Sequence, residues 1–554
     1  MEIKPLLQRL QVKHEGGTAP NRWINNDIKP IEAGRRIWTF WTFHNLWVLT
    51  NTNISSYMVG SSLIALGLRW WEAVIAIVVS SVISMVFIVL NSTPGAFYHL
   101  GFPIANRYTW GMYGMQFVVL NRILLSLVWY AVQAWIGGSC VYVCLEAIWP
   151  DLERRIPNHM PASTGMTTAQ FVTYLIFCII SLPLIWIRPH KLRNFFYVAS
   201  ATVLVFEFSL LIWALATMGS GGFGDTITGA PDVQDTNKGW SIVYGIISCI
   251  GGISAGILNQ NDYARFARRP RDAILGQIIS PVIYANVTPI IGILVTAATQ
   301  ERYGEAMWNL PGLLSAVQQT GGPRSRAAAF FAGAALVISQ FGINVPGNAL
   351  SGGFDFAALF PKYLNIRRGA YITALLSMVV NPWQLLATAS VFLSVLSSYS
   401  VFLGPMIGLM ISSYYLVNKQ KINVDHLYVG NSESIYWFTA GINWRAPVAW
   451  ICGVAPSMPG FISAVSPGIK VPIGATRLYY ICFLSGLAIS AAVFVALNYI
   501  FPPRALNAWV NGPGTAKEAM KEFRDRWDAM DAEARGQDVN AKEVEVVSEM
   551  PKEV

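Results

Sequence analysis

The chain has 554 residues, of which 54% are hydrophobic and 12% are charged, and its mean hydropathy is +0.44. This composition is far too apolar for an ordinary soluble enzyme and predicts an all-α protein that crosses a membrane many times. The net charge of +9 is spread over loops and tails without a basic aromatic stripe, which disfavours nucleic-acid binding.

Residues 1–37 are polar and lack the apolar core of a cleavable signal peptide, so we expect a cytosolic N-terminal tail. Twelve apolar runs follow, each long enough to cross a bilayer of about 30 Å. We expect residues 501–554 to form a second cytosolic tail, partly helical and then disordered, because the chain turns strongly charged there. The twelve runs lie at roughly 38–66, 73–92, 115–146, 168–187, 193–218, 241–264, 273–299, 327–350, 369–387, 390–417, 445–465 and 478–500.

Two of these runs contain helix-breaking residues at mid-span. Thr50 to Asn53 interrupt the first run, and Gly251 and Gly252 interrupt the sixth. A break at membrane depth survives only where it lines a cavity, so matching breaks five spans apart predict a substrate site between inverted repeats. We expect a five-plus-five transport core at 38–418, with repeats at 38–218 and 241–418, followed by a loop and two further spans at 419–500.

The loop charges predict the orientation of the chain in the membrane. With both termini in the cytosol, most basic loop residues fall on the inner side, as the positive-inside rule prefers. The outer side then carries an acidic loop with Asp225, Asp232 and Asp235. The inner basic residues are Arg188, Lys191, Arg193, Arg265, Arg268, Arg269, Arg271, Lys362, Arg367, Arg368, Lys419 and Lys421.

The third run places Trp129 and Gln133 four residues apart, so both project from one helical face. An indole can stack on a flat heterocycle, and a carboxamide can both donate to and accept from a –CO–NH– edge. This pair predicts a binding site for an amide-bearing ring. The alternative is an interfacial tryptophan and a glutamine that packs between helices.

Runs eight and ten contain irregular stretches, which predict proximity to a cavity or a gate. In run eight, Gly342 to Asn348 are rich in glycine, proline and asparagine, and in run ten Ser397 to Ser400 precede Gly404 and Pro405. Asn344 and Asn348 lie on nearly the same face of run eight. They are candidate substrate ligands, or they form hydrogen bonds between helices.

Two titratable residues are candidates for carrying a proton. Glu207 lies in the middle of run five, where a lone carboxylate costs several kcal/mol unless it is paired or protonated. His44 in run one can change its charge near neutral pH. At the end of run six, Asp262 and Arg265 form either a gating pair or an interfacial cap.

The chain contains no Walker loop, nucleotide fingerprint, spaced metal ligands or supported Ser/His/Asp set. We therefore expect neither an enzyme nor a cofactor or metal site. A solute carrier without a nucleotide site must draw its energy from an ion gradient.

Several motifs together resemble the nucleobase-cation-symport family 1, in particular its fungal uracil, uridine and allantoin permease branch. The resemblance runs from about residue 26 to residue 501. The motifs are Asn26–Pro30, Gly60–Ser62, Gly67–Trp71, Pro94–Ala96, His99–Pro103, Trp129–Gly138 and Asn259–Arg265. It implies a LeuT-like fold of twelve helices, alternating access and proton-coupled uptake of a ring compound across a fungal plasma membrane.

The resemblance also implies roles for individual residues. Trp129 is similar to the family's stacking tryptophan, Gln133 and Asn348 to its binding amides, and Gly252 to a backbone contact. Ile253 and Asn53, the latter in the break of the first run, are the remaining two of six expected substrate contacts. Leu396 and Tyr399 resemble a gate and selectivity region, and Asp27 resembles a cytosolic gate.

At two places the sequence differs from bacterial members of the family, so the roles of their site residues cannot be transferred to this chain there. Bacterial members bind sodium through hydroxyl residues in helix eight, whereas Gly342 and Ile343 stand here, which argues against that sodium site. Ile253 stands where bacterial members place a second stacking tryptophan, so a one-sided aromatic contact is expected.

These observations predict a proton symporter that imports uracil, allantoin, uridine or a related ring. A thiamine or nicotinamide-riboside permease of the same family is the nearest rival. A nutrient sensor that keeps a carrier fold without transporting is the rival from another class. The expected partners are a small ring compound, protons and membrane lipid.

Overall fold

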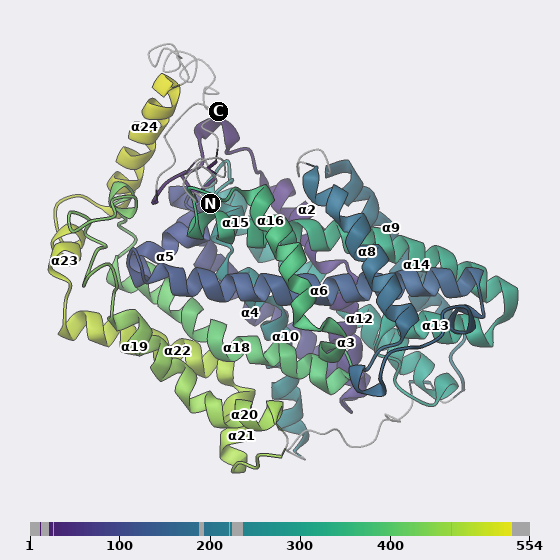
Figure 1. Cartoon of the computed structure of the whole chain (residues 1–554). Coiled ribbons are helices and arrows are strands. Elements are labelled where there is room, and N and C mark those ends of the chain that lie inside the picture. Colours follow the sequence, from purple (N-terminus) through teal and green to yellow (C-terminus); the bar gives the residue numbers. More distant parts are fainter. Residues whose placement is uncertain are drawn as a thin grey trace, which may run out of the picture.

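The computed structural model describes residues 11–12, 22–25, 27–187, 193–220, 222–223, 237–466 and 468–534. In these residues the protein is helical and contains no strand, which confirms the all-α prediction (Figure 1). The predictions for Asn26, Arg188, Lys191, the acidic loop residues Asp225, Asp232 and Asp235, and the tail beyond residue 534 lie outside the described residues.

Nine helices in the described part of the chain are long and apolar enough to cross a membrane, so a total of twelve stays a prediction. Several of these crossings consist of more than one helical segment. They are α4 (Trp70–Tyr98), α6 (Met115–Ile148), α8 (Thr168–Trp186), α10 (Lys238–Leu258), α12 (Pro270–Tyr303), Gly322–Leu359, Ala389–Val417, Arg445–Val465 and α22 (Cys482–Ile500).

The first predicted span is broken where the sequence indicates. Helix α2 (Phe40–Asn51) ends and α3 (Ile54–Ala65) begins after two residues without helical conformation. Asn53 is the N-cap of α3, and its side chain accepts a hydrogen bond from the Ser56 amide at 3.0 Å. A short polar side chain at an N-cap satisfies an amide that the helix leaves unpaired.

The predicted break at Gly251 and Gly252 is wrong. Helix α10 runs through both glycines without interruption, and the chain turns only between α10 and α11 (Asn261–Ala264). A Cβ on Gly251 would lie 2.1 Å from the backbone oxygen of Leu396. The glycine therefore permits close contact between α10 and α18 (Ala389–Ser412) and does not unwind the helix.

The irregular stretch predicted in the eighth span is confirmed. In the tenth span the irregular turn lies further along the chain than predicted. A π-helical turn, η4 (Val345–Ala349), separates α14 (Gly322–Asn344) from α15 (Leu350–Leu359). Such turns often lie at functional sites. In contrast, α18 is continuous through Ser397 and Pro405, and the π-helical turn η6 (Ser413–Val417) follows it.

The ninth predicted span is not one helix. It consists of α16 (Ile366–Leu376), η5 (Ser377–Val380) and α17 (Pro382–Leu385), with Asn381 at φ 55° between the last two. Proline and a left-handed residue both stop a helix, which explains the interruption.

The remaining elements are shorter or lie beside the spans. Helix α9 (Arg193–Ala216) corresponds to the fifth predicted span. The others are η1 (Ala33–Arg35), α5 (Phe102–Trp110), α7 (Leu152–Arg155), η2 (Ala162–Thr164), α13 (Leu310–Thr320), η7 (Asp425–Leu427), α19 (Arg445–Val454), η8 (Ala455–Ser457), α20 (Met458–Val465), α21 (Ile473–Tyr480), α23 (Arg504–Val510) and α24 (Ala516–Ala534).

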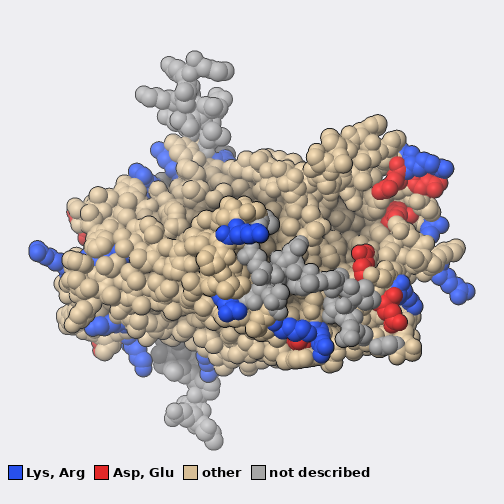
Figure 2. Space-filling view, turned by 90° about the horizontal axis from the view of Figure 1, so that it is seen from below, with Lys and Arg blue, Asp and Glu red and all other residues tan. Residues whose placement is uncertain are grey.

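Two groups of helices pack against each other. Helix α12 packs on α2, α3 and α4, and α4 also packs on α10, whereas α6 packs on α8, α14 and α15. In Figure 1, α6 crosses in front of α4, α10 and α12. The face drawn in Figure 2 is mostly uncharged, with scattered basic side chains and with acidic side chains gathered toward its right-hand end, and this low charge is expected for a protein embedded in lipid.

Helix α24 docks on the side of the protein where α2 begins and α4 ends. Its Met520 and Phe523 are buried, and the Phe523 ring lies 5.9 Å from the ring of Tyr98. Arg36 donates a hydrogen bond to Asp528 at 3.1 Å, and Arg526 forms an ion pair with Asp425. The helix therefore connects the entry of α2 to the loop after α18.

Candidate functional site

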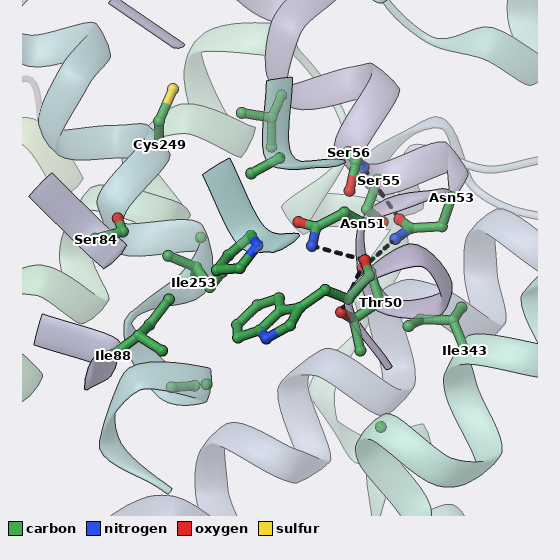
Figure 3. Close-up of a pocket in the computed structure, with 18 of the residues that line it drawn as sticks. Thr50, Asn51, Asn53, Ser55, Ser56, Ser84, Ile88, Cys249, Ile253 and Ile343 are labelled. Atoms are coloured by element: carbon green, nitrogen blue, oxygen red, sulfur yellow. Dashed lines mark hydrogen bonds between the residues drawn. The ribbon is translucent and has the colours of Figure 1, made fainter. Parts of the chain in front are cut away.

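A cavity of about 250 Å³ lies between the two groups of helices. This size is at the lower end of ligand pockets, which hold roughly 300–1,000 Å³, and fits a small ring compound. In Figure 3, Ser84, Ile88 and Ile253 lie opposite the break between α2 and α3. All six predicted substrate residues line the cavity, namely Asn53, Trp129, Gln133, Gly252, Ile253 and Asn348.

The break in the first span forms one wall of the cavity and is held by its own side chains. Asn51 donates to the Trp47 carbonyl at 2.9 Å, and Asn53 donates to the Thr50 carbonyl at 2.7 Å (Figure 3). Because Asn53 also accepts from the Ser56 amide, both polar atoms of its side chain are occupied. Asn53 therefore holds the break in shape, and its role as a direct ligand stays a prediction.

Trp129 supplies the aromatic surface of the cavity. Its indole is half-buried, and its ring lies 6.2 Å from that of Tyr399, tilted by 42°. A Cβ on Gly252 would lie 3.7 Å from the Leu396 side chain. Leu396 and Tyr399 thus lie behind Gly252 and Trp129 and are not among the cavity-lining residues, and their gating role stays a prediction.

Gln133 is held by a residue that the sequence analysis missed. Gln340 of α14 donates to the Gln133 side-chain oxygen at 2.9 Å and to its backbone oxygen at 3.2 Å. Both residues are buried. This contact leaves the Gln133 amide nitrogen for a ligand and fixes the direction of the carboxamide. The one signal for Gln340 is its place one turn before Asn344 in the irregular span.

Asn348 is oriented by a chain of amides. It lies in η4 and donates to Asn344 at 3.0 Å, and Asn344 donates to the Tyr130 carbonyl of α6 at 3.2 Å. Asn344 is therefore a helix-to-helix contact, as one sequence alternative stated. The side-chain oxygen of Asn348 remains for a ligand that offers an N–H group.

Arg122 is a second cavity-lining residue that the sequence did not single out. It is 5% exposed and donates to the hydroxyls of Ser126 and Ser351, each at 2.6 Å. The charges of Asp262 and Asp355, both buried, lie within electrostatic reach of Arg122. Their opposite sign offsets the cost of burying a guanidinium. A lone arginine inside an apolar run gave no sequence sign of these partners.

The predicted gating pair of Asp262 and Arg265 is not formed as an ion pair. Asp262 accepts from the Phe102 amide at 2.9 Å and so caps α5, while Arg265 donates to the Asp27 backbone oxygen at 3.2 Å. Burial raises the pKa of the Asp27 carboxyl, against the opposing charge of Arg265. Asp27 thus lies beside Arg265, the residue after the end of α11, and is not among the cavity-lining residues.

The two proton-carrier candidates do not line the cavity. Glu207 of α9 is completely buried and accepts from the Thr288 hydroxyl at 2.9 Å. His44 of α2 is hydrogen-bonded to Tyr284 at 2.9 Å and to Ser280 at 3.2 Å. Both residues contact α12, and their role in proton transport stays a prediction.

A family model described as "Permease for cytosine/purines, uracil, thiamine, allantoin" matches residues 30–486. The chain belongs to this family. Among curated relatives of this permease, the allantoin permease of Saccharomyces cerevisiae is 36% identical over 86% of the chain and 76% of the relative. The uracil permease of the same yeast is also 36% identical, again over 86% and 76%.

The solved structure of Mhp1, a nucleobase-cation-symport-1 family transporter with bromovinylhydantoin bound, superposes with a TM-score of 0.69. The alignment covers 90% of the permease and 100% of Mhp1 at 19% identity, so it establishes the LeuT-like fold. The protein is accordingly a multi-span membrane permease for small molecules and not an enzyme.

Proposed function

We propose that this permease imports a nucleobase-like ring compound across the plasma membrane together with protons. Uracil, allantoin and uridine are the proposed substrates, because the relatives named above include allantoin and uracil permeases and a uridine permease is 34% identical. The observation that carries this proposal is the convergence of the Trp129 indole with the oriented amides of Gln133 and Asn348 on one cavity.

The chemistry of the three side chains fits a planar ring with a –CO–NH– edge. The indole offers a face for stacking, Gln133 offers an N–H donor, and Asn348 offers an oxygen acceptor. Ile253 gives the opposite wall an aliphatic surface, so the ring is stacked on one side. Rocking of the helices packed around α12 against the helices packed around α6 then opens the cavity to one side of the membrane and closes it to the other.

We propose protons as the coupling ion and Glu207 or His44 as their carriers. The bacterial sodium design needs hydroxyl ligands in helix eight, and Gly342 and Ile343 supply none. We further propose that both termini lie in the cytosol, because this orientation places most of the basic loop residues on the cytosolic side of the membrane.

One experiment tests the function directly. The permease is produced in yeast cells that lack their own ring-compound permeases, and uptake of labelled uracil, uridine, allantoin and thiamine is measured at pH 5 and pH 7. We expect uptake of at least one of the first three and faster uptake at pH 5. Exclusive uptake of thiamine would favour the rival permease, and binding without net uptake would favour a sensor.

A further inference from the structure

Helix α12 presents two faces to two different groups of residues. Residues four apart in sequence lie on the same face of a helix. Two sets of residues that are offset by one position therefore lie on two neighbouring faces. One face lines the substrate cavity, and the other is polar and points to α2 and α9. The cavity face carries Pro281, Ala285 and Pro289, and the polar face carries Ser280, Tyr284 and Thr288.

Glu207 meets this polar face at membrane depth. Its Oε2 accepts from the Thr288 hydroxyl at 2.9 Å, and its Oε1 has no hydrogen-bond partner among the described residues. The side chain is completely buried. An ionised carboxylate in such a place is energetically costly. Binding of a proton to Glu207 removes this cost.

His44 meets the same face one turn away. Its Nε2 is hydrogen-bonded to the Tyr284 hydroxyl at 2.9 Å, and its Nδ1 to the Ser280 hydroxyl at 3.2 Å. Two titratable side chains from two different helices are therefore attached to adjacent turns of α12.

The other titratable groups around Glu207 are few. Tyr57 of α3 lies within electrostatic reach of the carboxyl. Glu301 and Arg302 lie at the far end of α12, where Arg302 donates to the Thr217 carbonyl at 3.2 Å. Arg324 and Arg326 lie in the first turns of α14. Among the described residues, no cation forms an ion pair with Glu207, and its polar contact is the Thr288 hydroxyl.

Helix α12 packs closely against both halves of the broken span. A Cβ on Gly60 of α3 would lie 2.0 Å from the backbone oxygen of Pro289 in α12. A Cβ on Gly292 of α12 would lie 2.3 Å from the backbone oxygen of Tyr57 in α3. A Cβ on Gly276 would lie 2.6 Å from the Phe43 side chain of α2. Packing this close couples the position of α12 to those of α2 and α3.

Building on the proton-coupled import proposed above, we propose that Thr288 is a positioning residue for the coupled proton. It holds the Glu207 carboxyl on the helix whose neighbouring face lines the cavity. When Glu207 is ionised, its Oε2 accepts a charge-assisted hydrogen bond from Thr288. When Oε1 binds a proton, Oε2 still accepts from Thr288, but this bond is weaker and Oε1 becomes a donor that needs a partner. The protonation state of Glu207 is thereby coupled to the position of α12, which packs on the cavity and on the broken span.

The test is the pH dependence of uptake in a Thr288→Val variant. Valine keeps the shape of threonine and removes the hydroxyl donor. A buried carboxylate without its donor binds a proton more readily, so we expect the pH of half-maximal uptake to rise by about one unit. Thr288→Ser should restore the wild-type profile. Thr299→Val is the matched control, because the buried Thr299 hydroxyl donates within its own helix, to the Val295 carbonyl at 2.8 Å.

The outcomes separate this inference from the proposed function. A Thr288→Val protein with normal surface level and an unchanged pH profile would overturn the role of Thr288. If that variant is poorly folded, Thr288→Ala, which also removes the hydroxyl donor, is measured in its place. The same rise is expected, and an unchanged profile would overturn the proposal. Wild-type uptake that ignores pH would instead overturn the proton coupling itself.

Discussion

At the residue scale, the orientation of Gln133 is the feature on which substrate recognition depends. Gln133→Ala removes the amide, so we expect uptake to be lost while the surface level stays normal. Gln340→Leu leaves Gln133 in place but frees its carboxamide, so we expect the KM for the substrate to rise about 10-fold, the equivalent of one lost hydrogen bond of about 1.4 kcal/mol. Uptake of labelled substrate at increasing concentrations measures both variants, and a Gln133→Ala protein that still transports with the wild-type KM would remove this residue from the site.

Asn53 is expected to behave differently from the ligand amides, although it lines the same cavity. Its two polar atoms are bound to Thr50 and Ser56, so Asn53→Ala removes a helix cap worth about 0.5–2 kcal/mol. We expect a lower melting temperature in detergent and a broadly slower uptake. The pattern of competition among ring compounds should stay as in the wild type, and a changed pattern would make Asn53 a ligand after all.

The sequence predicted some residues of the site better than others for physical reasons. Trp129 and Gln133 were found because their spacing places them on one helical face. Gln340 and Arg122 were missed because their partners come from other helices. The partner of a single polar residue in an apolar run cannot be inferred from the sequence.

At the element scale, glycine pairs in membrane helices have two structural uses that a sequence does not distinguish. Gly251 was predicted to break its helix and instead lets α18 approach it. We expect Gly251→Ala to destabilise the protein by about 1–3 kcal/mol, because the added methyl meets the Leu396 carbonyl. Gly256→Ala is the control, since its methyl meets only the Ile253 side chain at 3.6 Å. Thermal melting of the two purified variants in detergent measures the difference, and equal melting temperatures would contradict the packing role.

The lengths and order of most helices followed from the apolar runs, because a membrane-crossing helix must hide its backbone over the whole bilayer. The π-helical turn at Val345–Ala349 was indicated by glycine and proline in the sequence. The division of the ninth span was not predicted, because its apolar composition masks the left-handed Asn381.

At the scale of the whole molecule, α24 joins the entry of the broken span to the loop after α18. The ion pair of Arg36 and Asp528 is part of this contact, and the Arg36 side chain is only 9% exposed. In a double-mutant cycle with Arg36→Ala and Asp528→Ala, we expect a coupling of about 0.5–1 kcal/mol in thermal unfolding. Arg154→Ala with Asp151→Ala, an exposed pair, is the control and should show less coupling. Equal coupling in both cycles would mean that this ion pair contributes little to the docking of α24.

The docking of α24 has a practical consequence for anyone who attaches a reporter to this permease. A protein shortened before Ala516 would leave the Tyr98 ring and the Arg36 guanidinium uncovered, since Phe523 and Asp528 are their partners. A fluorescent tag is therefore better joined beyond Ala534, where it leaves the covering helix intact. Activity lost on truncation would then reflect exposed contacts rather than a missing transport residue.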